Sequence, residues 1–387
     1  MPAPFDRLLG ATAALETPFA MIDAPTLWAN ADDLVRRADG VPIRVASKSV
    51  RVRSVIEQTL QRPGFAGVMS YSLAESNWLA DHGVDDILLA YPTVSRDALA
   101  QLVRSDRRRA AVTVMVDSVE SLDRIDALIG PDHPTIRVCL DVDASLKLGP
   151  VHLGVRRSPV HTARHARRLA AAIEQRRGFD LVGVMFYDAQ IAGLPDSSAA
   201  VRFVKRRSAA ELLERRSAVV AAVGEHADLE LVNAGGTGSL EVTGADPSIT
   251  ELTAGSGLFS PTLFDGYDAF ESHPAAYFVL SVVRKPARNI ATLFAGGYIA
   301  SGPATASRQP SPVWPAGLKP IGAEGSGEVQ SPLKGRAART LAIGDRVVMR
   351  HAKAGEMCER FDQIAIVEAD GGTALVPTYR GEGKNFG

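Results

Sequence analysis

The stretch IRVASKS (residues 43–49) is a short apolar strand followed by a lysine, and it is the first of eight such runs before residue 256. Helical or loop segments separate the runs, as in a parallel sheet with crossover helices. Most runs are nearly continuous in apolar residues, which is typical of strands buried on both faces. The predicted strands are residues 43–46, 67–71, 86–90, 111–116, 135–141, 181–187, 229–233 and 250–253. Eight of them predict an α/β fold, a closed (β/α)8 barrel of the TIM type, with an open doubly wound sheet as the alternative.

The sequence pattern changes after residue 270, where short strand-like runs follow one another without helical segments between them. We expect these strands at residues 277–283, 290–294, 345–349, 364–367 and 374–376, which indicates a second, all-β domain. Residues 296–335 are rich in Gly and Pro and contain Trp314. A stretch of this length without a strand or helix pattern predicts a functional loop wrapped over a surface, with a flexible linker as the alternative.

The composition of the 387 residues limits the classes of partner. Hydrophobic residues make up 46% and charged residues 22%, and the net charge is -1, as in a globular protein without a nucleic-acid-binding excess of basic residues. We therefore expect a small-molecule partner, no nucleic acid and no membrane. No apolar run approaches about 18 residues and the N-terminus lacks a secretory pattern, so the predicted location is cytoplasmic. The only cysteines, Cys139 and Cys358, are far apart, which fits a reducing compartment, and Cys139 is expected in the core.

Lys48 ends the first predicted strand, where the chemistry of a parallel barrel collects. An ammonium is costly to bury beside an apolar strand, so its pKa should fall, as a Schiff-base lysine requires. A surface lysine at a strand end is the alternative. The chain has only 8 Lys among its 43 basic residues, which makes an incidental lysine less expected here.

Two glycine-rich loops follow the seventh and eighth predicted strands. They are NAGGTGS (residues 233–239) and AGSG (residues 254–257). Such loops let backbone N–H groups approach a phosphate, and Thr237 and Ser239 add hydroxyl groups. Neither loop matches a Walker A or dinucleotide fingerprint, and each alone reads as a simple turn. At adjacent strand ends of a barrel that carries Lys48, they point to a cofactor with one phosphate and an aldehyde, pyridoxal 5′-phosphate.

With these motifs the chain resembles the alanine-racemase-fold (fold type III) pyridoxal-phosphate enzymes, within them the D-threonine aldolase and D-serine dehydratase group, and most of all its bacterial amino acid deaminase/aldolase branch. The resemblance covers nearly the whole chain. The motifs that carry it are TPFAMID (17–23), RVASK (44–48), GVMFYDAQIAG (183–193), NAGGTGS (233–239), ELTAGSG (251–257) and TYRGEGK (378–384).

The resemblance implies a cofactor-binding barrel at residues 25–270 and a β-domain at residues 271–387 that also takes in residues 1–24. It implies a homodimer, and Lys48 as the residue that forms the Schiff base. Tyr187 would lie near the cofactor ring. The phosphate would lie on Gly236, Thr237, Gly238, Ser239, Gly255, Ser256 and Gly257.

In the aldolases and dehydratases of this group, a divalent metal beside the cofactor is held by a His and by a second ligand two residues later. This chain departs from the pattern, because HAKAGEMC (residues 351–358) has Lys353 at that position. A metal bound by His351 with Cys358 suits zinc, and one bound by His351 with Glu356 suits manganese or magnesium. The alternative is that His351, as a catalytic residue, and Glu356 hydrogen-bond the substrate or a loop without a metal.

Several polar segments have open roles. Asp141 and Asp143 end the fifth predicted strand, and His152 replaces a basic residue of the relatives, so it either contacts the cofactor or makes an ordinary hydrogen bond. Helical spacing is expected at residues 72–82 and 159–177. The basic run at residues 202–216 also has helical spacing, and a solvated helix face is its simplest interpretation.

The implied activity is that of a pyridoxal-phosphate-dependent lyase on D-β-hydroxy amino acids, an aldolase that releases glycine and an aldehyde. A dehydratase that forms a 2-oxo acid and ammonia is the first alternative. A racemase is the next, and it needs a second base, for which Tyr298 and Tyr379 of the β-domain are open possibilities. A non-catalytic carrier of the cofactor, as in the small single-domain barrels of this fold, is disfavoured by the predicted β-domain.

Overall fold

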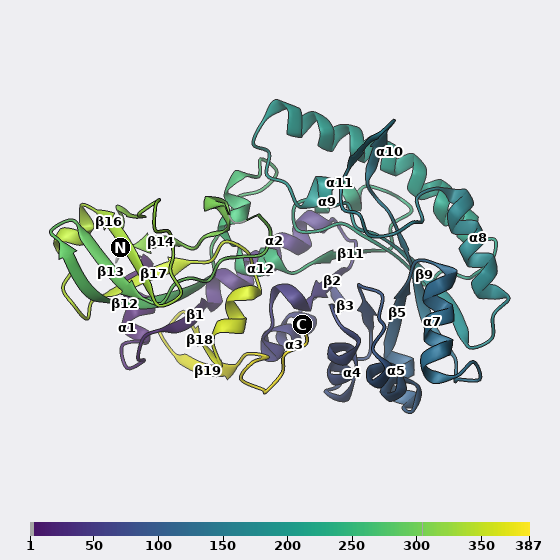
Figure 1. Cartoon of the computed structure of the whole chain (residues 1–387), viewed down its shortest axis with the longest axis horizontal. Helices are drawn as coiled ribbons and strands as arrows, with labels where there is room; N and C mark the ends of the chain where they lie inside the picture. The colour runs from purple at the N-terminus through teal and green to yellow at the C-terminus, as the bar shows by residue number, and fades with distance from the viewer. Residues whose placement is uncertain (1–3, 304) are drawn as a thin grey trace.

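The computed structural model describes residues 4–303 and 305–387. Figure 1 shows an elongated molecule with a barrel and its helices at one end and a β-rich part at the other. The first and last parts of the chain are not confined to separate ends. The N-terminal helix lies in the β-rich part, and the C-terminus lies close to the barrel helix α3 (Arg53–Leu60).

Eight parallel strands close into a barrel in the order β10-β11-β2-β3-β4-β5-β6-β9. The strands are β2 (Ile43–Ala46), β3 (Phe65–Ser70), β4 (Ile87–Leu89), β5 (Val112–Val116), β6 (Ile136–Val142), β9 (Phe179–Phe186), β10 (Leu231–Ala234) and β11 (Glu251–Ala254). Pairing of Leu252 with Ile43 joins the last strand to the first. The closed barrel predicted from the sequence is confirmed, and the open sheet is wrong.

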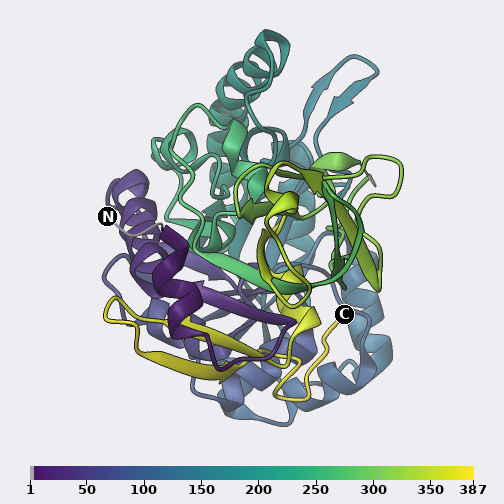
Figure 2. The same ribbon diagram turned by 90° about the vertical axis from the view of Figure 1, so that its left-hand side faces the viewer.

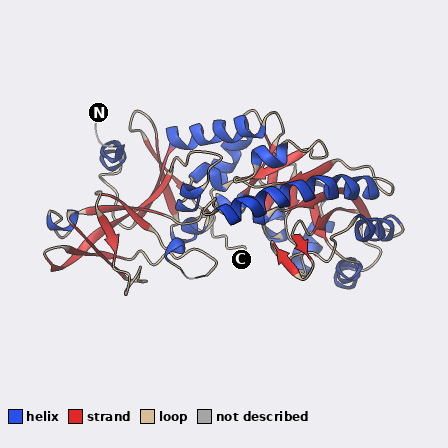
Figure 3. Cartoon of the chain, turned by 90° about the horizontal axis from the view of Figure 1, so that it is seen from above, coloured by secondary structure: helices blue, strands red, loops and turns tan. Residues whose placement is uncertain are grey.

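Helices cover the outside of the barrel (Figure 3). They are α2 (Ala24–Ala38), α3, α4 (Leu73–Asp81), α5 (Arg96–Val103), α6 (Asp106–Ala111), α7 (Val119–Ile129), α8 (Ala163–Glu174), α10 (Ala199–Val223) and α11 (Leu240–Gly244). Two short helices, α9 (Ala189–Ala192) and α12 (Ser256–Phe259), lie instead at the C-terminal ends of β9 and β11. The expected helices at 72–82 and 159–177 are α4 and α8. Both begin at a hydroxyl cap, because the side chains of Ser72 and Thr162 accept a hydrogen bond from a backbone N–H of the first turn.

The basic run at residues 202–216 lies on α10, but it is only partly a solvated face. Arg202 is exposed, as expected. Arg216, in contrast, is buried and pairs with Asp246 at 2.5 Å. Arg215 donates hydrogen bonds to the backbone carbonyl groups of Asp143 and Ser145, at 2.7 Å and 3.0 Å. The prediction is therefore wrong for these two arginines, since they attach α10 to the loops at the end of the barrel.

The β-rich part contains a sheet of nine strands in the described residues, ordered β15-β16-β13-β12-β1-β18-β19, with β17 between β12 and β14. Its strands are β1 (Phe19–Asp23), β12 (Ala276–Ala287), β13 (Ile290–Phe294), β14 (Ser311–Trp314), β15 (Leu318–Pro320), β16 (Gln330–Gly335), β17 (Arg346–Arg350), β18 (Gln363–Val367) and β19 (Thr373–Pro377). The N-terminal strand β1 lies inside this sheet, antiparallel to β12 and parallel to β18.

The stretch at residues 296–335 differs from its prediction as a structureless loop. Its second half forms β14, β15 and β16, and β16 pairs with β13 along five residues. The sequence does not predict these strands because Gly and Pro interrupt them; Pro is usual in edge strands such as β14 and β15, but β16 carries Pro332 between two neighbouring strands. Among the described residues before β14 there is one short 3-10 turn, η3 (Ala306–Arg308). Its Arg308 lies beside residues at the C-terminal ends of the barrel strands.

Three further features complete the fold. A two-stranded hairpin, β7 (Leu146–Leu148) with β8 (Val151–Leu153), projects from the barrel (Figure 2). Cys139 is buried inside the barrel beside Met115 and Met185, as expected, and neither it nor the buried Cys358 forms a disulfide. Among the described residues, no helix combines the length and the apolar character that crossing a membrane requires.

Candidate active site

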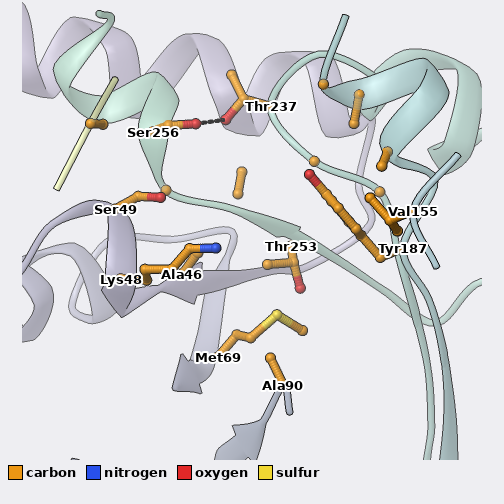
Figure 4. A pocket seen from close by; sticks show the side chains of 18 of the residues that line it. Ala46, Lys48, Ser49, Met69, Ala90, Val155, Tyr187, Thr237, Thr253 and Ser256 are labelled. Carbon is orange, nitrogen blue, oxygen red and sulfur yellow. Dashed lines mark hydrogen bonds between the residues drawn. The ribbon is translucent and has the colours of Figure 1, made fainter. Parts of the chain in front are cut away.

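A cavity of about 530 Å³ opens at the C-terminal ends of the barrel strands. Lys48 lies in η1 (Ser47–Ser49), the turn directly after β2, and its amine points into the cavity between Tyr187 and the pair Thr237 and Ser256 (Figure 4). The side chain is exposed to the cavity. The prediction that Lys48 is buried is therefore wrong, because the end of β2 faces the cavity and is not covered by apolar side chains.

The Lys48 amine has one hydrogen-bond partner among the described residues, the Tyr91 hydroxyl group, to which Nζ donates at 2.9 Å. Tyr91 follows the end of β4 and also lines the cavity. Burial alone would raise the pKa of Tyr91, but the positive charges of Lys48 and Arg157 lower it below its ordinary value. Tyr91 and Lys48 therefore form a hydrogen-bonded pair on the cavity wall.

Arg157 is a cavity residue that the sequence reading missed. Its guanidinium lies 4.5 Å from the ring centre of Tyr187 and 5.2 Å from that of Tyr91, in reach of a cation–π interaction with both. His152, which was the candidate for this place, lies instead in β8, with Nε2 3.6 Å from a carboxylate oxygen of Asp143. The basic group near the cofactor site is supplied by Arg157, five residues beyond His152.

Asp143 is a structural anchor, not part of the cavity lining. Burial acts to raise its pKa, but hydrogen bonds from His161, Ser145 and Lys147 hold the pKa well below its ordinary range. Lys147 Nζ lies 2.9 Å from the carboxylate. His152 therefore faces the Asp143 carboxylate and does not line the cavity.

The two glycine-rich loops meet at the cavity wall. Thr237 and Ser256 share a hydrogen bond at 3.3 Å between their hydroxyl groups, and both side chains line the cavity together with Gly236 and Gly255. A side chain at position 255 would place its Cβ 2.6 Å from the Ala46 carbonyl oxygen, so only glycine fits there. Two hydroxyl groups on adjacent loops give a place where a phosphate can accept hydrogen bonds.

The other three predicted phosphate residues lie behind this wall. Ser239 Oγ accepts a hydrogen bond from the Gly236 backbone N–H at 3.2 Å, which closes the loop. The Gly257 N–H donates to Thr237 Oγ1 at 3.1 Å and orients that hydroxyl group. Gly238 packs against the Tyr267 ring, where a Cβ would collide. The Ser239 side chain and the Gly257 N–H are therefore engaged within the loops, and Gly238 is required by the close packing on Tyr267.

The β-rich part forms the opposite wall of the cavity. Arg308 from η3, together with Lys353 and Ala354 from the segment after β17, lines the cavity. Gly355 holds this segment against the barrel, because any Cβ there, at φ 90°, would collide with the Lys48 carbonyl oxygen. The turn that carries Lys48 is therefore in direct contact with the segment that carries Lys353.

The charged side chains that line the cavity are all basic. Four basic residues line it, and within the described part of the chain no Asp or Glu does so. None of the four forms an ion pair within 4.0 Å in that same part. The basic residues are Lys48, Arg157, Arg308 and Lys353. Such a cavity favours ligands that carry negative charge, as a phosphate and a carboxylate do.

These residues fit pyridoxal 5′-phosphate. Lys48 supplies a free amine for its aldehyde, Thr237 and Ser256 supply hydroxyl groups for its phosphate, and Tyr187 presents an aromatic side chain. The cavity volume is within the range of small-molecule sites, roughly 300–1,000 Å³. Lys48, Tyr187, Gly236, Thr237, Gly255 and Ser256 are thus brought together as the sequence predicts.

The described residues do not gather three side-chain ligands for a divalent metal, although His351 and Glu356 border the same cavity. His351 borders a second cavity of about 400 Å³ instead of the first, and both of its ring nitrogens are buried without a hydrogen-bond partner in the described structure. Burial lowers the pKa of His351 to about 3, so the ring is neutral. Cys358 borders neither cavity, and burial raises the pKa of its thiol to about 12. No three His, Cys, Asp or Glu side chains of the described residues are grouped to hold a metal.

Several known proteins are similar to this chain in sequence or in fold. The 3-hydroxy-D-aspartate aldolase of Paracoccus denitrificans (strain Pd 1222) is 24% identical over 247 residues, which is 63% of this chain and 60% of that relative. The D-threonine aldolase of Filomicrobium marinum superposes with a TM-score of 0.80 at 20% identity, over 95% of this chain and 96% of that one. The D-threo-3-hydroxyaspartate dehydratase of Delftia sp. HT23 gives a TM-score of 0.73 at 20% identity, over 94% and 97%.

The two superpositions show a shared fold of barrel and β-rich part over almost the full length. The match to a family model is more specific, because it runs from the end of β1 through the barrel strands and includes Lys48 and both glycine-rich loops. The alanine racemase N-terminal domain matches residues 22–259, more than half of the chain, and this protein belongs to that family.

Proposed function

We propose that this protein is a pyridoxal-phosphate-dependent lyase that cleaves D-β-hydroxy amino acids, in the manner of a D-threonine aldolase. The observation that carries the proposal is the Lys48 amine, free in a cavity whose other walls hold the Thr237 and Ser256 hydroxyl groups. The names of the similar proteins support the substrate class, since they act on D-threonine and 3-hydroxy-D-aspartate.

Each wall of the cavity has a distinct task in this proposal. Lys48 holds the cofactor through its amine, and the loops with Thr237 and Ser256 hold the phosphate. When bound, pyridoxal phosphate withdraws electrons from the α-carbon of the attached amino acid, so that one bond to that carbon can break. Arg308 and Lys353 attract the carboxylate of the substrate and orient it.

A dehydratase is the second candidate function, and one contact favours it. In a dehydratase Lys48 must take the α-proton, and the Tyr91 hydroxyl group at 2.9 Å is placed to exchange a proton with that amine. The structural similarity to the D-threo-3-hydroxyaspartate dehydratase also supports this candidate.

Racemase and carrier functions have less support. Tyr379 is buried and donates to Glu75 at 2.9 Å, and Tyr298 borders the second cavity, so neither offers a base to the Lys48 cavity within this chain. A carrier would not need the β-rich part, whose Arg308 and Lys353 line the cavity. We further propose a homodimer in the cytoplasm; the buried free thiols Cys139 and Cys358 support a reducing compartment, and light scattering on the purified protein tests the dimer.

Product analysis tests the proposal. Purified protein loaded with pyridoxal phosphate is incubated with D-threonine, and the products are identified. Glycine with acetaldehyde is the expected result and identifies an aldolase, whereas 2-oxobutyrate with ammonia identifies a dehydratase. Absence of both products with every D-β-hydroxy amino acid would refute the proposed function.

A further inference from the structure

Lys353 lines the active-site cavity from the β-rich part, apart from the barrel loops whose hydroxyl groups suit a phosphate. It lines the cavity that holds the Lys48 amine and also borders the second cavity, so it stands at the junction of the two. Its segment is pressed against the Lys48 turn through Gly355. The phosphate-suited hydroxyl groups belong to the barrel loops, on another wall.

The Lys353 ammonium is available to a ligand. Nζ donates to the Ser301 hydroxyl group at 2.9 Å, and the Ser301 N–H donates to both carboxylate oxygens of Glu356, at 3.1 Å and 3.0 Å. Among the described residues Lys353 has no carboxylate within ion-pairing distance. One of its three N–H groups is therefore used to hold the side chain in place, and two remain.

The charges around Lys353 are those of the active site. Burial lowers its pKa, Arg308 and Lys48 lower it further, and Glu356 and Tyr91 act in the opposite direction. These groups lie within electrostatic range of Lys353, and two of them form the hydrogen-bonded pair that would hold the cofactor. Lys48 and Lys353 line the same cavity, so an amino acid bound at the Lys48 amine would share that cavity with the Lys353 ammonium.

We propose that the Lys353 ammonium binds the hydroxyl oxygen on the β-carbon of the substrate and makes the reaction independent of a divalent metal. This inference rests on the proposed function. A compact ammonium suits a single oxygen, whereas the planar fork of Arg308, whose Nη1 is buried without a partner, suits the α-carboxylate. A fixed positive charge at the β-oxygen stabilises negative charge that develops there when a bond to the β-carbon or its hydroxyl group breaks.

Binding of two ligands that differ by one oxygen tests the proposal. D-Serine and D-alanine are mixed rapidly with the holoenzyme, and dissociation constants are obtained from the visible absorbance of the cofactor before turnover. Wild-type protein should bind D-serine about tenfold or more tightly than D-alanine, as a charge-assisted hydrogen bond implies. Lys353→Met should remove this ratio, and Lys353→Arg should keep part of it. The matched control is Lys319→Met, which removes an exposed lysine of β15 and should leave the ratio unchanged.

The outcomes separate the possible roles. Equal weakening of both ligands in Lys353→Met, or no change, overturns the proposal, as does weakening of D-aspartate without weakening of D-serine, which assigns the lysine to a distal carboxylate. Retention of the cofactor absorbance shows that a variant is folded.

Metal analysis is a second test of the same proposal. The holoenzyme should contain no stoichiometric divalent cation, and a chelator should not change the ratio of the two dissociation constants. A bound metal that His351→Ala releases contradicts the proposal. Absence of lyase products from wild-type protein refutes the proposed function alone, because the binding ratio is measured without products.

Discussion

The two walls of the active site differ in how they are built. The barrel wall consists of residues that directly follow strands, with Lys48 after β2 and the hydroxyl groups of Thr237 and Ser256 after β10 and β11. The wall from the β-rich part consists of Arg308 and Lys353, which come from irregular segments that are distant in sequence. The first wall suits a cofactor and the second suits a substrate.

This difference shows which parts of a site are set by local sequence. In a parallel barrel, the residue after each strand must lie at the same end, so strand prediction alone brings those residues together. The residues of the other wall reach the cavity only through the packing of the nine-stranded sheet on the barrel. We therefore expect changes on the barrel wall to affect cofactor binding and changes on the other wall to affect substrate binding.

The largest effect is expected from Lys48→Ala. Removal of the Lys48 amine, which points into the cavity from the barrel wall, should lower turnover by about a thousandfold or more, since the residue proposed to hold the cofactor is lost. Turnover of D-threonine and the visible absorbance of the cofactor measure this. Full activity in this variant would contradict the assignment of cofactor binding to the barrel wall.

A smaller loss is expected from Gly255→Ala, which tests the barrel wall through its backbone. The new Cβ would lie 2.6 Å from the Ala46 carbonyl oxygen, so the loop must move away from the phosphate site. Overpacking of this kind costs about 1–3 kcal/mol, or about tenfold or more in the affinity for pyridoxal phosphate. The control is Gly322→Ala, where no atom lies within 4 Å of the added Cβ. Equal affinities of the two variants, measured by titration of the apo-protein, would contradict the proposed phosphate site.

The contact between the two parts of the molecule behind Lys48 predicts a dependence of stability on pH. Glu75 is buried, which raises its pKa to about 7, and it accepts hydrogen bonds from Tyr379 Oη at 2.9 Å and from the Tyr71 N–H at 2.8 Å. Its pKa in the folded state lies above that in the unfolded state, so the folded protein binds this proton more tightly. The free energy of unfolding should therefore fall as the pH rises from about 4.5 to about 7, by at most about 3 kcal/mol.

Glu75→Gln removes this titration and should flatten the dependence. Chemical denaturation of both proteins at about pH 5 and about pH 8 measures the change. The wild-type protein should lose stability between the two pH values, and the variant should lose less. An equal loss in the two proteins means that Glu75 does not control the stability of this contact.

The smallest effect on activity is expected from Cys358→Ala. Cys358 is 1% exposed and borders neither cavity, so turnover should stay within about twofold of the wild type. The smaller side chain should lower the free energy of unfolding by about 1–2 kcal/mol, as measured by urea denaturation. A large loss of turnover together with loss of a bound metal would instead identify this thiol as a metal ligand.

The sequence predicts the barrel well because its eight strands are apolar runs between helices, and the pattern is local. It also predicts Lys48, Gly236, Thr237, Gly255 and Ser256, which follow those strands. Arg157 was not predicted, because the hairpin of β7 and β8 lies between it and the strand that it serves.

The wall from the β-rich part could not be predicted for a different reason. Arg308 lies in a stretch that reads as a loop, and Lys353 is visible in the sequence only as the absence of a metal ligand. Their positions depend on tertiary contacts, such as Gly355 against the Lys48 carbonyl group, which no spacing encodes. The prediction that Lys48 is buried is wrong for the same reason. Whether a strand end faces an open space or packed side chains depends on tertiary contacts with the opposite wall.

One measurement tests most directly the claim that the cofactor belongs to the barrel wall. The holoenzyme is reduced with borohydride, digested, and mapped by mass spectrometry to find the lysine that carries the cofactor. The cofactor is expected on the peptide that contains Lys48. Label on Lys353, the other lysine that lines the cavity, or on no lysine, would contradict it.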